Sequence, residues 1–349
     1  KEIFSEKYSH LYVKDEDVEN EIQMITRDTS SLLDFGAFLD LYSLIDTETD
    51  IDKISLTYAE LHEKFGFSHV EGGVFLGLPS SIKMYVDKSR EWFHDMLASR
   101  DNIRLKLNKE ITEIEDAPLA GKTNSTPRVL IDGTLFDYVI DCTYNQAFPI
   151  TSAANFEDAQ PIFEAGFSLI FAERRNHGIE KPFMPFSIYD GDFPGMTPFN
   201  IDDIGNSKFR EFRGRKLYVG ASGRLVKTYQ FDSSKDAQKM VRAKQKEANI
   251  RFEKNHLFYT NNDCEFDLDA KKVIDATELY YPPLMQRFDC IYKYWWIKSI
   301  FRSGTAARPV IVQRHLDHPQ LISVFSSKIS TVIKAERDLF DLIMQDVYF

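Results

Sequence analysis

The spacing of apolar residues changes between helical and strand-like patterns along the chain. Through residues 16–43, apolar side chains recur at steps of three and four, which predicts two helices separated by a break near Asp28. Thr57 and Glu60 have the spacing of a capping box, so a short helix is expected to begin there and to end at Gly66. The N-terminal stretch is therefore expected to be mainly helical.

The following stretch changes to the period-two pattern of β-strands. A glycine-rich turn, EGGVFLGLP, and a helix over residues 80–97 come first. Residues 103–115 then alternate apolar and polar side chains, and Asp132-Gly133 lies between two apolar runs, which is typical of a tight hairpin. We therefore expect a small β-meander that leads into the strand of DYVIDC.

Most of the remaining pattern predicts strands of an antiparallel sheet. A helix over residues 234–252 interrupts them, and a helical stretch over 269–287 must kink or end at Tyr-Tyr-Pro-Pro. The chain closes with the apolar strand LISVF, the small-residue sequence SSKIST and an amphipathic helix. The expected strands cover residues 163–173, 183–189, 195–200, 216–229, 291–301, 309–314 and 321–325.

This order of elements predicts a mixed α/β (α+β) fold, because helices and strands do not alternate regularly as in a plain doubly wound protein. The 349 residues exceed the size of most single hydrophobic cores, which favours two domains. The net charge of −11 and the lack of a basic stripe argue against nucleic acid as a partner.

The sequence also bears on the compartment of the protein. Its three cysteines form no CxxC pair, which favours a reducing environment. No apolar run approaches the roughly 20 residues that span a bilayer, and the first residues lack the apolar segment of a signal peptide. We expect a soluble, cytoplasmic protein that acts on a small molecule, without a membrane partner.

Metal and nucleophile chemistry find little support in the sequence. His315 and His318 are the densest histidine pair, but no third ligand is evident, and a loop pair is the better interpretation. There is no HExxH motif, no GxSxG elbow and no P-loop. Cys142 follows an apolar strand and is expected to be a small core residue rather than a reactive thiol.

The C-terminal strand, small-residue turn and helix form the most informative pattern. Backbone N–H groups at a helix N-terminus, with Lys328 and several hydroxyls beside them, favour a ligand that carries negative charge. The alternative is an ordinary capped helix, which needs one of those hydroxyls. These residues alone favour neither interpretation over the other.

This ending resembles the C-terminal signature of FAD-dependent oxidoreductases of the D-amino-acid-oxidase-like (glycine oxidase-like) superfamily. The segment DYVIDCTYNQ is similar to a second part of that family, in the same order along the chain. Ser327 and Tyr144 stand where the family usually has glycine. The resemblance implies FAD as the cofactor, with contacts from Ile111, Cys142, Thr143, Tyr144, Ser326, Ser327, Lys328, Ile329, Ser330 and Thr331.

The resemblance also implies a domain organisation and a reaction. An FAD/NAD(P)-binding-type domain, interleaved along the chain with an antiparallel-sheet substrate domain, would comprise residues 1–15, 72–160 and 302–349. The substrate domain would comprise residues 16–71 and 161–301. Hydride transfer to flavin would oxidise an amine or hydroxyl carbon of a small polar substrate. Arg308, with Arg302 as its neighbour, is expected to anchor a substrate carboxylate, and the alternative for either is a surface ion pair.

One part of the family pattern has no counterpart here. The family begins with a strand, a GxGxxG turn and a helix, which hold the pyrophosphate. Gly72, Gly73 and Gly77 have a different spacing and follow no predicted strand. An N-terminal βαβ half-unit of about 40 residues is thus absent from the sequence. The second hypothesis is therefore a flavin-free relative that acts as a binding or scaffold protein.

Overall fold

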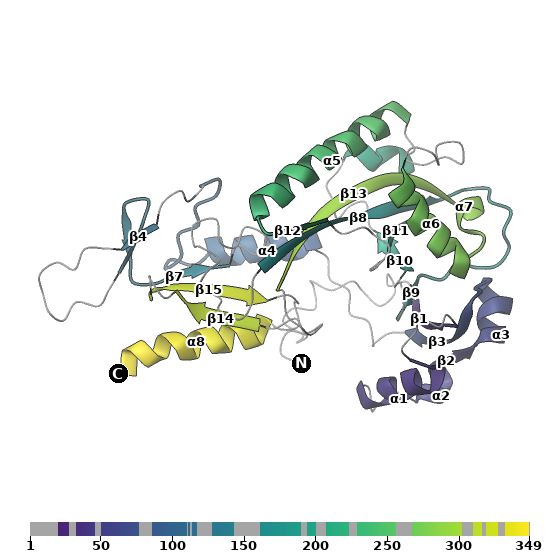
Figure 1. The fold of residues 1–349 in the computed structure, drawn as a ribbon, viewed down its shortest axis with the longest axis horizontal. Coiled ribbons are helices and arrows are strands. Elements are labelled where there is room, and N and C mark those ends of the chain that lie inside the picture. The colour runs from purple at the N-terminus through teal and green to yellow at the C-terminus, as the bar shows by residue number, and fades with distance from the viewer. Residues whose placement is uncertain are drawn as a thin grey trace, which may run out of the picture. The chain divides into compact units, whose positions relative to one another are not determined.

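The computed structural model describes residues 20–27, 33–45, 50–76, 86–109, 111, 114–116, 128–142, 161–189, 194–199, 207–222, 229–255, 267–301, 310–315, 319–326 and 332–348 (Figure 1). The chain divides into two compact units. The first comprises Lys1–Leu105, Gly166–Lys227 and Lys244–Trp295, and the second comprises Lys106–Ala165, Thr228–Ala243 and Trp296–Phe349. The boundaries that the resemblance implies for the two functional domains stay a prediction.

A nine-stranded sheet is the largest element of the fold. Its strands follow the order β12-β8-β11-β10-β9-β1-β3-β2, and β13 pairs with β8. Apart from the parallel pair β1–β9, the registered pairs are antiparallel, which confirms the expected antiparallel sheet. The strands are β1 (Glu21–Thr26), β2 (Ser55–Thr57), β3 (Val70–Leu76), β8 (Pro161–Glu173), β9 (Phe186–Ile188), β10 (Pro194–Phe199), β11 (Leu217–Ser222), β12 (Tyr229–Phe231) and β13 (Phe288–Phe301).

Buried side chains cover both faces of strand β8. Ile170 belongs to a buried cluster with Phe252 of helix α5 (Ser234–Asn255). Phe171 is the next residue of the strand and therefore points to the opposite face. Its registered partner Tyr218 packs edge-on against Phe183 there. Aromatic side chains thus pack against both faces of β8.

Helix α6 (Leu268–Tyr280) ends where the sequence predicts a break. The Tyr281 N–H donates to the Thr277 carbonyl (2.8 Å), and two prolines follow that cannot continue the helix. A short helix, α7 (Leu284–Arg287), then leads into β13. The helical stretch expected over residues 269–287 is confirmed as two helices.

The N-terminal segment corrects two predictions. Residues 21–26 form strand β1 and not a helix, because Ile22 and Ile25, which fit helical spacing, are fully buried in a strand paired with β3 and β9. Residues 71–76 of EGGVFLGLP belong to strand β3 and not to a turn, and residues 77–79 lie outside the described residues. A Cβ atom on Gly73 would lie 2.9 Å from the Gln23 carbonyl oxygen, so this glycine permits close packing of two strands.

Other N-terminal predictions are confirmed. Helix α1 (Phe35–Ile45) is the second helix expected within residues 16–43, and α2 (Ile51–Ile54) follows it. Thr57 and Glu60 form the capping box of α3 (Tyr58–Glu60), and the next helical turn, Leu61–Phe65, ends at Gly66 with a φ of +85°. Helix α4 (Val86–Ala98) is the described part of the helix expected over residues 80–97. A 3-10 helix covers Ser207–Phe212.

The second unit contains two three-stranded sheets. One has the order β4-β5-β6, with β4 (Ile114–Asp116), β5 (Val129–Ile131) and β6 (Thr134–Phe136). Asp132 and Gly133, with φ angles of +44° and +75°, form the predicted two-residue turn between β5 and β6. The other sheet has the order β14-β15-β7, with β7 (Val139–Asp141), β14 (Val310–Arg314) and β15 (Leu321–Ser326).

Candidate functional site

Strands β7 and β15 run parallel and side by side in the second unit (Figure 1). Val139, Ile140 and Asp141 are paired with Leu321, Ile322 and Ser323, respectively. Because the two strands point the same way, their carboxyl ends lie at the same edge of the sheet. Open α/β sheets bind ligands outside the carboxyl ends of their strands.

The two segments that were expected to bind the cofactor both begin at this edge. Cys142 directly follows β7, and Ser326 is the last residue of β15. The other expected residues, Thr143, Tyr144, Ser327, Lys328, Ile329, Ser330 and Thr331, lie outside the described residues, as do Arg302 and Arg308. Their roles stay predictions.

Ile111 is described but is not part of a strand. Its side chain is 45% exposed. Residues 103–109, which the sequence predicts as strand, are exposed and irregular, and strand structure begins at Ile114. This prediction was wrong because an alternating pattern forms a strand only where a neighbouring strand pairs with it. A role for Ile111 at the adenine end of a cofactor stays a prediction.

Helix α8 (Val332–Tyr348) is fixed to the small sheet through its last turns. The Arg314 guanidinium of β14 donates to the Leu342 carbonyl (2.7 Å) and to the Asp346 carboxylate (2.8 Å). The Tyr138 hydroxyl donates to the same carboxylate (2.6 Å), and this bond raises the pKa of Tyr138. Since the C-terminal turns of α8 lie beside the start of β15, the N-terminus of α8 points toward the carboxyl edge. A helix N-terminus favours negative charge there.

Ser323 is a buried polar residue beside this edge. It is 4% exposed, and its hydroxyl has no hydrogen-bond partner among the described residues. By strand alternation it lies on the opposite face from Ile322, whose registered partner Arg314 contacts α8. A buried hydroxyl without a partner costs about 1–3 kcal/mol. Ser323 therefore fits a site at which a further polar group supplies the missing hydrogen bond.

Cys142 lies at this edge, directly after β7. Partial burial of the sulfur and the neighbouring Asp141 carboxylate raise the pKa of the Cys142 thiol, which is the opposite of what activates a nucleophile. The prediction that Cys142 is a core residue was wrong, because the residue is exposed where it leaves β7. Cys290 is the buried cysteine of the described residues, and burial raises its pKa strongly.

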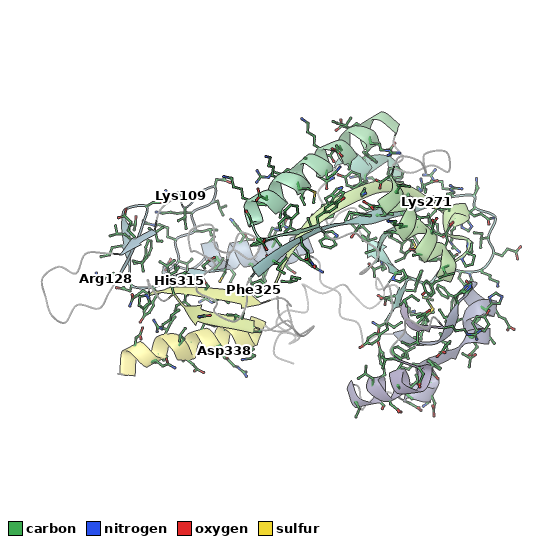
Figure 2. All side chains as sticks on the ribbon, in the orientation of Figure 1. Lys109, Arg128, Lys271, His315, Phe325 and Asp338 are labelled. Atoms are coloured by element: carbon green, nitrogen blue, oxygen red, sulfur yellow. The ribbon has the colours of Figure 1, made fainter. Side chains whose placement is uncertain are left out.

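The described ranges contain no group of three or more His, Cys, Asp or Glu residues that could hold a metal ion. His315 follows β14, is 5% exposed and donates its backbone N–H to the Leu321 carbonyl (2.9 Å) (Figure 2). Its place is therefore structural within the small sheet, and His318 lies outside the described residues. None of the helices in the described parts is long and apolar enough to cross a membrane.

The first unit holds a buried ion pair that the sequence patterns did not single out. The Lys293 ammonium lies 3.0 and 2.9 Å from the two carboxylate oxygens of Asp267 and 3.8 Å from the centroid of the Phe167 ring. The Lys293 side chain is 5% exposed, and burial lowers its pKa. Asp267 also caps α6 by accepting from the Ala270 N–H (2.9 Å). The available signal was a lysine inside the apolar strand sequence IYKYWWI.

A second set of charges in the first unit links Arg287 of α7 to Glu173 of β8, and Arg215, just before β11, to Asp289 of β13. The Arg287 guanidinium donates to the Glu173 carboxylate (2.6 Å) and to the Lys181 carbonyl (2.7 Å). Arg215 donates to Asp289 (2.6 Å). These charges are matched within the protein, which is typical of a structural network rather than of a ligand site.

Comparisons by sequence give no relative. No family model matches the chain, and no curated protein matches it significantly.

Comparisons by structure do find similar proteins. L-proline dehydrogenase from P. horikoshii aligns with a TM-score of 0.55 at 12% identity, over 99% of this chain and 76% of that one. Glycine oxidase from Bacillus cereus aligns with a TM-score of 0.54 at 10% identity, over 97% and 76% of the two chains. Fructosyl peptide oxidase from E. terrenum aligns with a TM-score of 0.56 at 12% identity, over 98% and 72%. The chain thus shares the fold of these oxidases and of this dehydrogenase, which confirms the fold that the resemblance implied.

Proposed function

We propose that this chain forms the larger part of an FAD-dependent oxidoreductase that oxidises an amine or hydroxyl carbon of a small, carboxylate-bearing substrate. The observation that carries the proposal is the parallel pair β7–β15, whose carboxyl edge gives rise to both segments that resemble cofactor-binding parts. The pair occurs in a fold shared with oxidases and a dehydrogenase of amino compounds.

The residues of this edge fit one side of a flavin nucleotide. The hydroxyl of Ser323 lacks a partner, and the N-terminus of α8 points toward the same edge. Ser326 and Cys142 begin the two segments that would lie against the cofactor. The sequence lacks the glycine-rich turn that holds a pyrophosphate. The chain thus supplies part of such a site, and the phosphate-binding part would come from elsewhere.

In this proposal the protein orients the substrate and excludes water, while bound FAD would accept a hydride from a substrate C–H bond. The guanidinium of Arg308, or of its neighbour Arg302, would hold the substrate carboxylate through two parallel hydrogen bonds. The buried charges of the first unit take no part, because each is already matched by a partner on the sheet.

A visible spectrum tests the cofactor. The protein is purified at its full natural length, with added FAD, and excess nucleotide is removed. We expect the two visible bands of oxidised flavin, and loss of these bands when an amino acid substrate is added without oxygen. A colourless protein that takes up no FAD would overturn the proposal and would leave the flavin-free binding protein as the better hypothesis.

A pair of arginine variants tests the carboxylate anchor. Arg308→Ala should lower kcat/KM for a carboxylate substrate roughly 30-fold or more, since truncating one partner of a buried charge pair costs about 2 kcal/mol or more. Turnover of the matching amine without a carboxylate should not change. Arg302→Ala, measured with the same two substrates, shows which of the two arginines is the anchor. Equal losses with both substrates would show that Arg308 acts on folding and not on the carboxylate.

A further inference from the structure

Strands β1, β9 and β10 are neighbours in the large sheet (Figure 1), and their two faces differ in burial. The side chains on one face are at most 2% exposed, and they are those of Ile22, Met24, Phe186, Ile188 and Met196. On the other face, Gln23 is paired with Ser187 and Ser187 with Gly195, and all three are half-buried. Because Gly195 has no side chain, the backbone itself forms the surface there. This second face is therefore a partly open strip of the sheet.

A carboxylate lies on this open strip. Glu21 comes two residues before Gln23 in β1 and therefore points to the same face. Its carboxylate accepts a hydrogen bond from the Ser187 hydroxyl (3.2 Å), and no Lys, Arg or His side chain of the described residues pairs with it. Opposite charges attract more strongly at a half-buried site than in bulk water. Glu21 therefore favours a ligand that brings a positive charge.

Two tyrosines lie beside this carboxylate. Phe38 of α1 is fully buried and packs against both, with ring centroids 5.1 Å from Tyr42 and 5.3 Å from Tyr189. The Tyr42 hydroxyl donates to the side-chain carbonyl of Gln23. Burial, the neighbouring Tyr189 and the Glu21 carboxylate raise the pKa of Tyr42 to about 12, so its hydroxyl is neutral at pH 7. A carboxylate beside aromatic rings is a combination that binds organic cations.

The part of the first unit around this strip is strongly acidic. Residues 20–27, 33–45 and 50–76 contain nine Asp or Glu residues and three Lys or Arg residues, a net charge of −6. A negative potential of this kind raises the local concentration of cations. One carboxylate supplies too few oxygen ligands for Ca²⁺ or Mg²⁺, and the described residues hold no larger group of metal ligands. An organic cation therefore fits the strip better than a metal ion.

We propose that Glu21, Tyr42 and Tyr189 form a binding site for an organic cation that carries a primary ammonium group. The ammonium donates to the Glu21 carboxylate and lies beside the two tyrosine rings, while its aliphatic chain covers the open backbone at Gly195. A free amine and the lysine side chain of a peptide both present this group. The proposal rests on the first unit alone and stands whether or not the protein binds flavin.

Titration of the full-length protein with n-butylammonium, followed by NMR of isotope-labelled tyrosine rings, tests this site. The signals of Tyr42 and Tyr189, assigned with the two Tyr→Phe variants, should shift in a saturable way. Glu21→Gln should weaken binding at least about tenfold, because it removes the charge while leaving an oxygen that accepts from Ser187. Glu63→Gln is the matched control. It removes one exposed charge of the same acidic part, and binding should change less than about twofold.

Two further ligands complete the test. Neutral n-butanol, which has the same chain length, should give no saturable shift at these rings. A lysine peptide with blocked ends distinguishes the two sources of the ammonium group: tighter binding than n-butylammonium assigns the site to a protein partner, and equal or weaker binding assigns it to free amines. Equal binding of n-butanol, equal losses for Glu21→Gln and Glu63→Gln, or the absence of a saturable shift at Tyr42 and Tyr189 would overturn the proposal.

Discussion

The large sheet and the small sheet that contains β7 and β15 differ in how fully their buried polar groups find partners. In and beside the large sheet, Lys293 of β13 and Arg287 of α7 are almost fully buried, and each charge is matched by a carboxylate within 3.0 Å. In the small sheet, the Ser323 hydroxyl is buried without a partner among the described residues, and Ile140 is left partly exposed. One region satisfies its own groups, and the other leaves polar and apolar groups unmatched.

This difference makes Ser323 the buried group that needs an explanation. Buried polar groups in native proteins are nearly always hydrogen-bonded, so each exception requires an explanation. Ser323 of β15 is one such exception among the described residues, and it lies close to the edge where α/β sheets bind ligands. The charges buried beside the large sheet are thus matched internally, whereas the Ser323 hydroxyl of the small sheet has no partner among the described residues.

The largest loss of stability is expected when the buried ion pair between Asp267 and Lys293 is broken. Asp267→Ala should lower the free energy of unfolding by about 3–5 kcal/mol, because it leaves the buried Lys293 ammonium without its partner. The control is Asp275→Ala on the same helix, which removes an exposed pair with Lys271 and should cost about 1 kcal/mol or less. Urea denaturation at neutral pH measures the free energy of unfolding of both variants. Lys271, the partner of the control residue, is labelled in Figure 2.

A double variant sharpens this result. Asp267→Ser keeps a capping oxygen for α6, and Lys293→Met keeps an apolar stem beside Phe167. Together they should recover most of the lost stability, since removing both charges leaves no buried ion unpaired. A double variant as unstable as Asp267→Ala would contradict the ion-pair explanation.

The second prediction compares how much stability is lost when isoleucine is replaced by alanine at two paired positions, Ile322 and Ile140. Ile322→Ala should cost about 2–5 kcal/mol, because the side chain is fully buried. Ile140→Ala, at its registered partner, should cost less than about 1.5 kcal/mol in the chain of residues 1–349. Urea unfolding of both variants gives the comparison. Equal costs would mean that Ile140 is covered and that the edge of β7 is closed.

The smallest effect is the change in stability at alkaline pH that is caused by Tyr292 of β13. Burial raises the pKa of Tyr292 from 10.0 to about 12, while its hydroxyl donates to Asn249 (2.5 Å) and accepts from Gln245 (2.7 Å). Since the folded pKa exceeds the unfolded value, the folded state binds more protons. The contribution of Tyr292 to stability is complete below pH 10 and is lost as the pH rises from 10 to 12.

Tyr292→Phe should therefore lose less stability than the unmodified protein between pH 10 and pH 12, by on the order of 1–2 kcal/mol. Tyr294→Phe is the control, because Tyr294 belongs to the same strand but is 52% exposed. Thermal unfolding at half-unit steps of pH measures the difference. Parallel curves for Tyr292→Phe and the unmodified protein would show that this hydroxyl does not couple folding to pH.

Short sequence patterns correctly predicted the features that are set by residues close together in the sequence. The Asp132-Gly133 turn needs positive φ angles at adjacent residues, and the Thr57–Glu60 capping box closes within one helical turn. Strand β1 and residues 103–109 were mispredicted because their state depends on partners far away in the sequence. The apolar residues of β1 lie between two strands, whereas the alternating residues 103–109 belong to no strand.

The candidate site was predictable in composition but not in arrangement. The sequence indicated two segments, which begin after Asp141 and at Ser326, as parts of one site. Their adjacency depends on the parallel register of β7 and β15, which no local pattern specifies. The pair of Lys293 and Asp267 was missed for the same reason, because the two residues lie 26 positions apart and meet through the packing of α6 on the sheet.

Amide hydrogen exchange at two adjacent residues of β7 tests the central claim most directly. In residues 1–349, the Val139 amide, which bonds to β15, should exchange slowly, and the Ile140 amide should exchange freely. A slow Ile140 amide, or a fast Val139 amide, would contradict the claim that β7 pairs with β15 on one side and is open on the other among the described residues.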